Sequence, residues 1–122
     1  EETIRKFDQE VYDLIMESFD ALPLSWLAGK KYFAMHGGIS PELKKIDQIN
    51  KYDRYQEPPL DGLMWDLLWA DPAEDDIATK TEYIENEERD CSFVFGRKPW
   101  KKLLDKNNLM TIVRAHQVQL DG

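Results

Sequence analysis

The sequence predicts a single mixed α/β unit, and this expectation rests on its patterning and its length. Amphipathic helical stretches alternate with short apolar segments bounded by glycine or proline, and no internal repeat, linker or low-complexity stretch divides the chain. A chain of 122 residues can bury one modest core, because domains most often contain about 100–150 residues. We therefore expect residues 1–122 to form one domain or part of one.

Three stretches predict helices. Between residues 7 and 22, apolar side chains recur at the spacing of an α-helix, and Pro23 ends the pattern because its ring clashes with the preceding turn. The apolar run at residues 63–69 predicts a buried helix, and residues 99–105 predict another with Pro99 near its first turn. The first helix also carries a row of carboxylates typical of a solvated face: Glu10, Asp13, Glu17 and Asp20.

Short apolar segments predict strands at residues 31–35, 91–95 and 110–113. After the first strand, Ser40 is expected to cap a short helix whose first position is occupied by Pro41. Residues 53–62 are rich in proline and end in Asp-Gly, which predicts a loop. The acidic residues 71–88 lack periodicity and predict a surface loop.

Charge and cysteine content disfavour several classes of protein. The chain has 16 basic and 24 acidic side chains, a net charge of −8, which repels nucleic-acid phosphates and anionic lipid. No apolar run approaches the ~20 residues of a membrane span, and the first residues lack the apolar stretch of a signal peptide. Cys91 is the single cysteine, so no internal disulfide can form. We therefore expect a cytoplasmic protein that neither spans a membrane nor binds nucleic acid.

The two histidines each follow an apolar strand. His36 comes directly after residues 31–35, and His116 follows residues 110–113. Sites in open α/β sheets form beyond the carboxyl ends of strands, so the two imidazoles are candidate ligands for one metal ion, with rings within about 5 Å of each other. A hydrogen-bonded structural role is the alternative for both histidines. Cys91 is either a third ligand, a nucleophile or part of the core, and its apolar neighbours favour the core.

Four sequence blocks, in order, resemble the signatures of the phosphoprotein phosphatase family. Residues 35–43, MHGGISPEL, resemble its HGG(L/I)SPE block, and residues 67–72, LLWADP, resemble its DLLWSDP block. Residues 89–93, RDCSF, are similar to its RGCS or RGVS segment, and residues 114–117, RAHQ, to its RAH(E/Q) segment. Residues 53–59 and 107–109 are most similar to the calcineurin branch, whereas Gln117-Val118 is closer to other members.

The resemblance implies a dinuclear metal enzyme that hydrolyses phosphoserine and phosphothreonine. Its fold would be part of the calcineurin-like metallophosphoesterase β-sandwich flanked by helices, with residues 1–122 forming the central-to-C-terminal part of the catalytic domain. His36 and His116 match two ligands of the same ion, Arg89 matches the arginine that binds the substrate phosphate, and Asp71 matches an acidic residue near the site. For Asp71, a simple turn role before Pro72 remains open. The implied chemistry is in-line attack on phosphorus by a metal-activated water.

The resemblance also implies cofactors and partners. The complete enzyme would hold two metal ions, which are iron, zinc or manganese, and this segment would supply ligands to one of them. Its substrates would be phosphoproteins. A calcineurin B-like regulatory subunit and calmodulin are expected to bind through regions that are not present in this sequence.

Two departures from the family pattern keep a second hypothesis open. The GDxHG, GDxxDRG and GNHE blocks that carry the remaining metal ligands are not present in the sequence, nor is a SAPNY-type loop. Asp90 replaces the glycine that usually follows the phosphate-binding arginine, and a carboxylate pointing toward a bound phosphate would repel it. The alternative to an enzyme segment is therefore a non-catalytic, phosphatase-like binding module.

Overall fold

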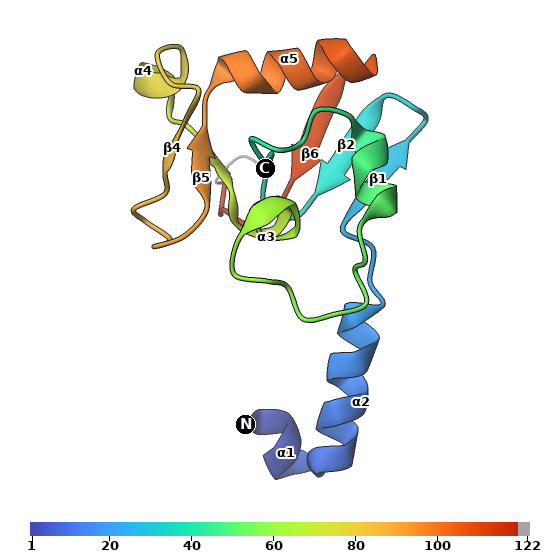
Figure 1. The fold of residues 1–122 in the computed structure, drawn as a ribbon. Helices are drawn as coiled ribbons and strands as arrows, with labels where there is room; N and C mark the ends of the chain where they lie inside the picture. Colours follow the sequence, from blue (N-terminus) through green and yellow to red (C-terminus); the bar gives the residue numbers. More distant parts are fainter. Residues whose placement is uncertain (120–122) are drawn as a thin grey trace.

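Two three-stranded sheets form the body of the described chain, which in this computed structural model comprises residues 1–119 apart from the side chain of Asp75 (Figure 1). The first sheet has the order β1-β2-β6 and the second the order β3-β5-β4. In chain order the strands are β1 (Ser25–Ala28), β2 (Tyr32–Met35), β3 (Asp71–Pro72), β4 (Tyr83–Glu85), β5 (Phe93–Phe95) and β6 (Thr111–Arg114). The predicted mixed α/β class is confirmed.

Helices connect and cover these sheets. They are α1 (Glu2–Lys6), α2 (Gln9–Asp20), α3 (Gly62–Trp69), α4 (Asp75–Ala78), α5 (Arg97–Asn107) and a 3-10 helix, η1 (Ile46–Lys51). In Figure 1, α5 lies across the top of the body from one sheet to the other, and α2 projects away from the body with α1 at its far end. Within the described residues, no helix has the length and apolar character needed to cross a membrane.

The projecting helix α2 is stabilised locally rather than by packing. The Asp8 side chain caps its start by accepting a hydrogen bond from the backbone N–H of Val11 at 2.9 Å. None of its residues is buried, and the side chains of Leu14 and Phe19 are 58% and 55% exposed. The predicted helix is confirmed, but its apolar face is not buried against the rest of the described chain.

Parallel pairing of β2 with β6 positions the two histidines. Tyr32 is opposite Thr111 and Met35 is opposite Arg114, while β1 pairs with β2 in the antiparallel sense. Neighbouring parallel strands end at the same edge of a sheet, and the long connection that this pairing requires includes α5. The segments that carry His36 and His116 therefore leave the sheet side by side.

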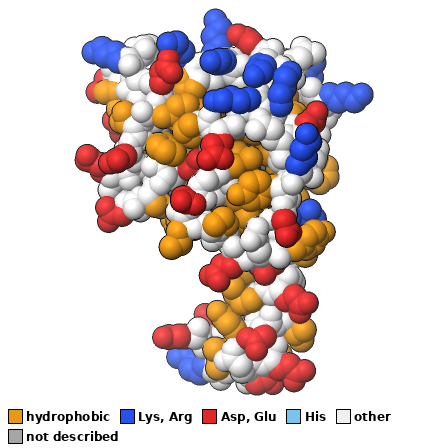
Figure 2. Space-filling view, viewed as in Figure 1, with side chains coloured by type: hydrophobic (Ala, Val, Ile, Leu, Met, Phe, Trp, Pro, Cys, Tyr) orange, Lys and Arg blue, Asp and Glu red, His pale blue; other side chains and the backbone are white. Residues whose placement is uncertain are grey.

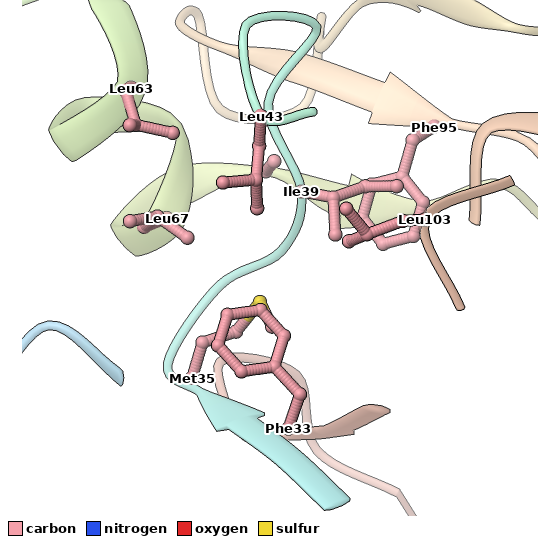
Figure 3. Packing of buried hydrophobic residues seen from close by; sticks show 9 residues of the cluster. Phe33, Met35, Ile39, Leu43, Leu63, Leu67, Phe95 and Leu103 are labelled. Carbon is pink, nitrogen blue, oxygen red and sulfur yellow. The ribbon is translucent and has the colours of Figure 1, made fainter. Parts of the chain in front are cut away.

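The core lies where the loop after β2 passes between α3 and the second sheet (Figure 3). Ile39 and Leu43 of this loop point between Leu67 of α3 and Phe95 of β5, with Phe33 of β2 nearby. Phe33, Ile39 and Leu67 are at most 2% exposed. Burying each such side chain contributes about 1.5–3 kcal/mol, so the loop that carries His36 is anchored by its own apolar residues.

The prediction of a surface loop over residues 71–88 is wrong. This segment contains β3, α4 and β4, because β3 and β4 pair with opposite sides of β5. Asp71 and Ile84 both lie opposite Val94, at distances along the chain that no local periodicity reveals. The pairing also makes Asp71 a buried residue at the end of α3, with 2% of its surface exposed.

The short helix predicted after Ser40 is also absent from the described chain. The Ser40 hydroxyl accepts a hydrogen bond from the backbone N–H of Glu42 at 3.1 Å and donates to Asp66 at 2.6 Å, so it holds a turn instead of capping a helix. The next helical turn is η1, whose start is held by the Gln48 side chain accepting from two backbone N–H groups. The sequence analysis did not predict α1, β1 or η1.

Candidate metal and phosphate site

The two histidine rings face each other beyond the ends of β2 and β6. His36 Nε2 and His116 Nδ1 lie 3.0 Å apart, and the ring centroids are separated by 4.9 Å. The predicted proximity of the two imidazoles is confirmed. Their role as metal ligands remains a prediction at this point, because a single proton shared between the two nitrogens would also satisfy them as a hydrogen bond.

The geometry of the pair fits two ligands of one ion. Two nitrogens that each lie about 2.1 Å from a cation, at an angle of about 90°, are about 3.0 Å apart. No third His, Cys, Asp or Glu among residues 1–119 joins them in a metal-binding group. Two imidazoles alone leave an ion underliganded, so this chain would contribute only part of a coordination sphere.

The surroundings of His116 favour a neutral imidazole. Burial lowers its pKa from the ordinary value of 6.5, and the positive charge of Arg89 lowers it further. The Trp69 ring packs edge-on against the imidazole with centroids 5.5 Å apart, and His116 Nε2 is buried without a hydrogen-bond partner in the described chain. The backbone of His116 has φ of 64°, a left-handed conformation that is uncommon outside glycine and that clusters at functional sites.

The two glycines after His36 allow a close backbone approach, but to α3 and β5 rather than to an ion. A Cβ on Gly37 would lie 2.5 Å from the backbone carbon of Leu68, and a Cβ on Gly38 would lie 2.3 Å from the ring of Phe95. The Gly37 amide donates to the carbonyl of Leu67 at 2.8 Å. The glycines therefore seat the histidine-bearing loop against the end of α3.

Asp71 is the centre of a buried charge network beside the histidine pair. Its Oδ2 accepts hydrogen bonds from Arg89 Nε at 3.1 Å and Asn86 Nδ2 at 3.0 Å, and its Oδ1 accepts one from Arg114 Nη2 at 2.7 Å. Burial acts to raise the pKa of this carboxyl, but the hydrogen bonds from Asn86, Arg89 and Arg114 outweigh burial and lower it. Asp71 is thus a held anion that orients two guanidinium groups, and not merely a turn residue.

Both arginines connect this network to the histidine segments. Arg89 Nη2 donates to the carbonyl of His116 at 3.3 Å, while its backbone is held by the Asn86 side chain at 3.3 Å. Arg114 Nε donates to the carbonyl of Gly37 at 2.7 Å. Two guanidinium cations therefore lie next to the imidazole pair, where they can attract and orient a phosphate.

A second buried carboxylate ties the histidine loop to the arginine loop. Asp66 of α3 accepts hydrogen bonds from Ser40 Oγ at 2.6 Å and from Ser92 Oγ at 2.7 Å. Burial raises the pKa of Asp66, and the two serine hydrogen bonds only partly offset this effect. Ser40 lies four residues after His36 and Ser92 three residues after Arg89, so Asp66 couples the positions of both segments.

The sequence analysis predicted the four main site residues but missed the residues that hold them. His36, His116, Arg89 and Asp71 lie together in the structure. Ser40 was expected only to cap a helix, and no role was predicted for the other supporting residues: Asn86, Arg114, Asp66 and Ser92. Only Arg114 carried a usable signal, since it ends a strand two residues before His116.

Asp90 and Cys91 line a hollow that includes neither His36 nor His116. Asp90 has φ of 53°, a conformation that glycine adopts without cost, which explains physically why a glycine is usual after the arginine. Cys91 is partly buried, and the hollow, of about 690 Å³, is also lined by Trp65 and Asp66. In the predicted buried helix, Met64 is buried and Trp65 and Trp69 are partly buried, and Phe93 of the predicted strand is also partly buried.

Comparisons with known proteins place this geometry in a family. The family model for the calcineurin-like phosphoesterase matches residues 1–120. The chain is 46% identical over 130 residues to the serine/threonine-protein phosphatase 2B catalytic subunit A1 of Saccharomyces cerevisiae, covering 99% of this chain and 24% of that protein. It is 37% identical over 123 residues to the serine/threonine-protein phosphatase 4 catalytic subunit of the same yeast, covering 100% of this chain and 38% of that protein.

A solved structure agrees with these relatives. It is described as a protein serine/threonine phosphatase from Saccharomyces cerevisiae with similarity to human phosphatase PP5, and it matches with a TM-score of 0.84 and 30% identity over 98% of this chain and 36% of that one. The chain therefore spans about a quarter to two-fifths of the length of these relatives. With the match over residues 1–120, the chain belongs to the calcineurin-like phosphoesterase family.

Proposed function

We propose that this chain is the segment of a serine/threonine protein phosphatase that supplies two histidine ligands to one ion of a dinuclear metal site, together with the arginine that binds the substrate phosphate. The single observation that carries this proposal is the 3.0 Å separation between His36 Nε2 and His116 Nδ1 beside the Asp71-held Arg89. Neutral imidazoles are common ligands of iron, zinc and manganese. We propose that the two metal ions of the site are drawn from these three metals.

The residues of the chain would divide the work of phosphate ester hydrolysis among them. When bound, two such ions would activate a water for in-line attack and offset charge on the phosphoryl oxygens. His36 and His116 would hold one ion through the two facing nitrogens. Arg89 would bind and orient the phosphate through its guanidinium, whose edge is fixed by Asp71. Arg114 would hold the backbone of the HGG turn and Asp71 together, as its two hydrogen bonds indicate.

The finer parts of the proposal are supported by the relatives. Phosphoserine and phosphothreonine proteins are the proposed substrates, because the similar proteins are named serine/threonine phosphatases. A calcineurin B-like subunit and calmodulin are proposed as partners of the complete protein through regions outside this sequence, on the basis of its similarity to the phosphatase 2B subunit. Residues 1–122 are proposed to form the central-to-C-terminal part of the catalytic domain, and the location is proposed to be cytoplasmic, in keeping with the single cysteine.

Metal content and turnover, measured together in the complete protein, test the proposal. His36→Ala is expected to reduce bound metal, measured by elemental analysis, and to remove most phosphatase activity on a phosphopeptide. The matched control is Asn50→Ala, an exposed residue of η1, which should change neither quantity. Full metal content and undiminished turnover in the His36 variant would refute the ligand assignment. A wild-type protein that binds metal but never releases phosphate would support the non-catalytic binding module instead.

A further inference from the structure

The helix α5 carries a concentration of positive charge that the proposed phosphatase site does not use. Residues 97–106 contain Arg97, Lys98, Lys101, Lys102 and Lys106 against one acidic residue, Asp105. This segment has a charge of +4 within a chain of −8, which leaves −12 on all the other residues. Figure 2 shows the blue side chains gathered along the top of the molecule, over α5, while red side chains dominate the lower parts. The protein is therefore strongly polarised.

The basic face of α5, defined as Lys98, Lys101, Lys102 and Lys106, brings several like charges together. Only Lys106 in the last turn and Lys101, four residues before Asp105, are placed where a cation favours the helix. Lys98 and Lys102 are spaced i,i+4, as are Lys102 and Lys106, and like charges at this spacing repel each other. Lys98 also lies in the first turn, where the helix dipole favours acidic residues, and its partner is the exposed Glu82. Lys101, Lys102 and Lys106 are exposed and form no ion pair with a described residue.

The surface beneath these lysines is hollowed. The lysines of the basic face and Asp105 line an open depression of about 540 Å³. Next to it, a notch of about 110 Å³ lies between α5 and the segments that carry Leu43 and Tyr83. The apolar lining of the notch includes Pro99 and Leu103. Its walls also carry Lys44, Lys98, Lys102 and Lys106 and one carboxylate, Glu82, which is paired with Lys98, so cations outnumber anions there. An apolar side chain fits such a notch while carboxylates on either side of it meet the ammonium groups.

We infer that the basic face of α5 and its notch are a docking surface for an acidic segment of a partner protein that carries one apolar anchor residue. Charge complementarity selects the acidic chemistry, and the extent of the surface selects a short peptide, because an 11-residue helix is only about 16 Å long. A nucleic acid or an anionic membrane would extend beyond the helix onto a protein that otherwise carries −12, where repulsion opposes binding. The surface lies beside the start of β6, whereas the imidazole pair lies beyond the end of this strand. Docking there therefore leaves the metal site open.

Fluorescence anisotropy with a labelled Asp/Glu peptide of about eight residues, long enough to span the helix and carrying one central Leu, measures the predicted binding directly. Lys102→Glu is expected to weaken binding about tenfold, because it removes the central cation and adds a repelling carboxylate. The matched control is Lys6→Glu, which makes the same change of net charge in α1 at the far end of the molecule and should change binding less than about twofold. Replacing the Leu of the peptide by Ser should weaken binding roughly fivefold.

The thermal stability of the Lys102→Glu variant provides a second readout. If Lys102 had a purely structural role, its replacement would lower the thermal midpoint. Lys102→Glu creates favourable i,i+4 pairs with Lys98 and Lys106 and loses only the attraction between Lys102 and the exposed Glu82, so its thermal midpoint should be close to or above that of the parent protein. Loss of peptide binding with retained or raised stability supports the docking surface. A lowered midpoint would show that Lys102 has a structural partner and would overturn the inference.

Three binding results would also overturn it. The first is equal weakening by Lys102→Glu and Lys6→Glu, which would mean that only net charge matters. The second is absence of peptide binding at about millimolar concentration, the weak end of measurable affinity. The third is tighter, Lys102-dependent binding of single-stranded DNA or of phosphatidylserine vesicles than of the peptide, which would assign the surface to phosphate polymers or membranes. Because the assay measures binding without turnover, failure of the docking surface leaves the proposed phosphatase function untouched.

Discussion

Among single residues, Asp71 has the central role, because it neutralises part of the positive charge of Arg89 and Arg114 and fixes the positions of their guanidinium groups. Two guanidinium groups and one amide donate to its two oxygens, and 2% of the residue is exposed. Arg89 and Arg114 both donate hydrogen bonds to this one carboxylate, yet they contact different segments. Arg89 donates to the carbonyl of His116, and Arg114 donates to the carbonyl of Gly37. A single buried anion therefore sets the geometry of a cationic site.

Arg89 is predicted to govern substrate binding. In the complete protein, Arg89→Ala should raise KM for a phosphopeptide about 10- to 150-fold, because a charge-assisted phosphate contact contributes about 1.5–3 kcal/mol. Arg89→Lys should fall in between, since an ammonium keeps the charge but not the planar fork. Arg5→Ala, a surface arginine of α1, serves as the control in the same steady-state kinetics. Unchanged KM and kcat in Arg89→Ala would reduce Arg89 to a structural role.

The pH dependence of stability is predicted to report on Asp71. Its pKa is lower in the folded protein than the ordinary value of 3.8, despite burial, because of its hydrogen bonds to Asn86, Arg89 and Arg114. A carboxyl of this kind contributes stability above its unfolded pKa, and the contribution is lost as the pH falls through the folded pKa. Asp71→Asn should therefore destabilise at neutral pH, and its difference from the parent should shrink below about pH 4.

Urea unfolding midpoints of the parent and the Asp71→Asn variant, compared at neutral pH and at about pH 3, measure this effect. Asp47→Asn, an exposed acidic residue of η1, is the matched control. Taking the difference between variant and parent cancels the opposite contribution of Asp66, whose pKa is raised by burial and whose contribution to stability is lost as the pH rises. A difference that stays constant over the whole range would contradict the assignment.

At the scale of elements, α3 is the part that joins the two loops of the site. It seats the HGG turn through its carboxyl end and reaches the arginine loop through Asp66. Asp66→Ala should destabilise the protein by about 2–3 kcal/mol, because it leaves the buried hydroxyl of Ser40 and the partly buried hydroxyl of Ser92 without their acceptor. Asp66→Asn should cost less, since an amide can accept from one hydroxyl and donate to the other.

Chemical denaturation of the two Asp66 variants distinguishes this hydrogen-bonded tie from simple space filling. Equal losses in the alanine and asparagine variants would mean that the carboxylate charge, rather than the pair of hydrogen bonds, holds the loops. Asp61→Ala at the start of α3 is a suitable comparison, because its side chain forms no capping hydrogen bond. Its unfolding midpoint should stay close to that of the parent.

At the scale of the whole molecule, this 122-residue chain is predicted to lack phosphatase activity by itself. A dinuclear site needs several oxygen ligands in addition to two histidines, and residues 1–119 contain no third ligand beside the pair. The open apolar faces of α2 and β1, with Phe19 at 55% and Trp26 at 68% exposure, should also make the chain prone to self-association. Phosphate release from a phosphopeptide with added manganese, together with size-exclusion chromatography, tests both expectations.

The control for that assay is the same chain with His116→Ala, which should give the same background release of phosphate. Turnover by the unaltered chain that disappears in the His116 variant would show that the site is complete in these 122 residues. The prediction of a divided metal site would then be wrong.

The family-like blocks, the class of fold and the candidate residues could be predicted from the sequence, because they depend on local patterns. Helical spacing predicted α2, a bounded apolar run predicted α3, and a segment with Pro99 near its first turn predicted α5. Apolar runs predicted β2, β5 and β6, and all six predictions lie within one or two residues of the observed ends. The two histidines and Arg89 were predicted because each belongs to a contiguous motif with a distinctive residue type.

The contacts between these segments could be known only from the tertiary structure, because they join residues far apart in the sequence. The strands β3 and β4 form because β5 offers hydrogen-bonding partners on both sides, so the acidic stretch that contains them shows no period of its own. Asn86 and Asp66 are site residues through contacts 15 and 26 positions apart along the chain, and such separations leave no trace in a local pattern. Burial of Asp71 explains why its hydrogen-bond donors lie together, since an anion excluded from water needs such donors around it.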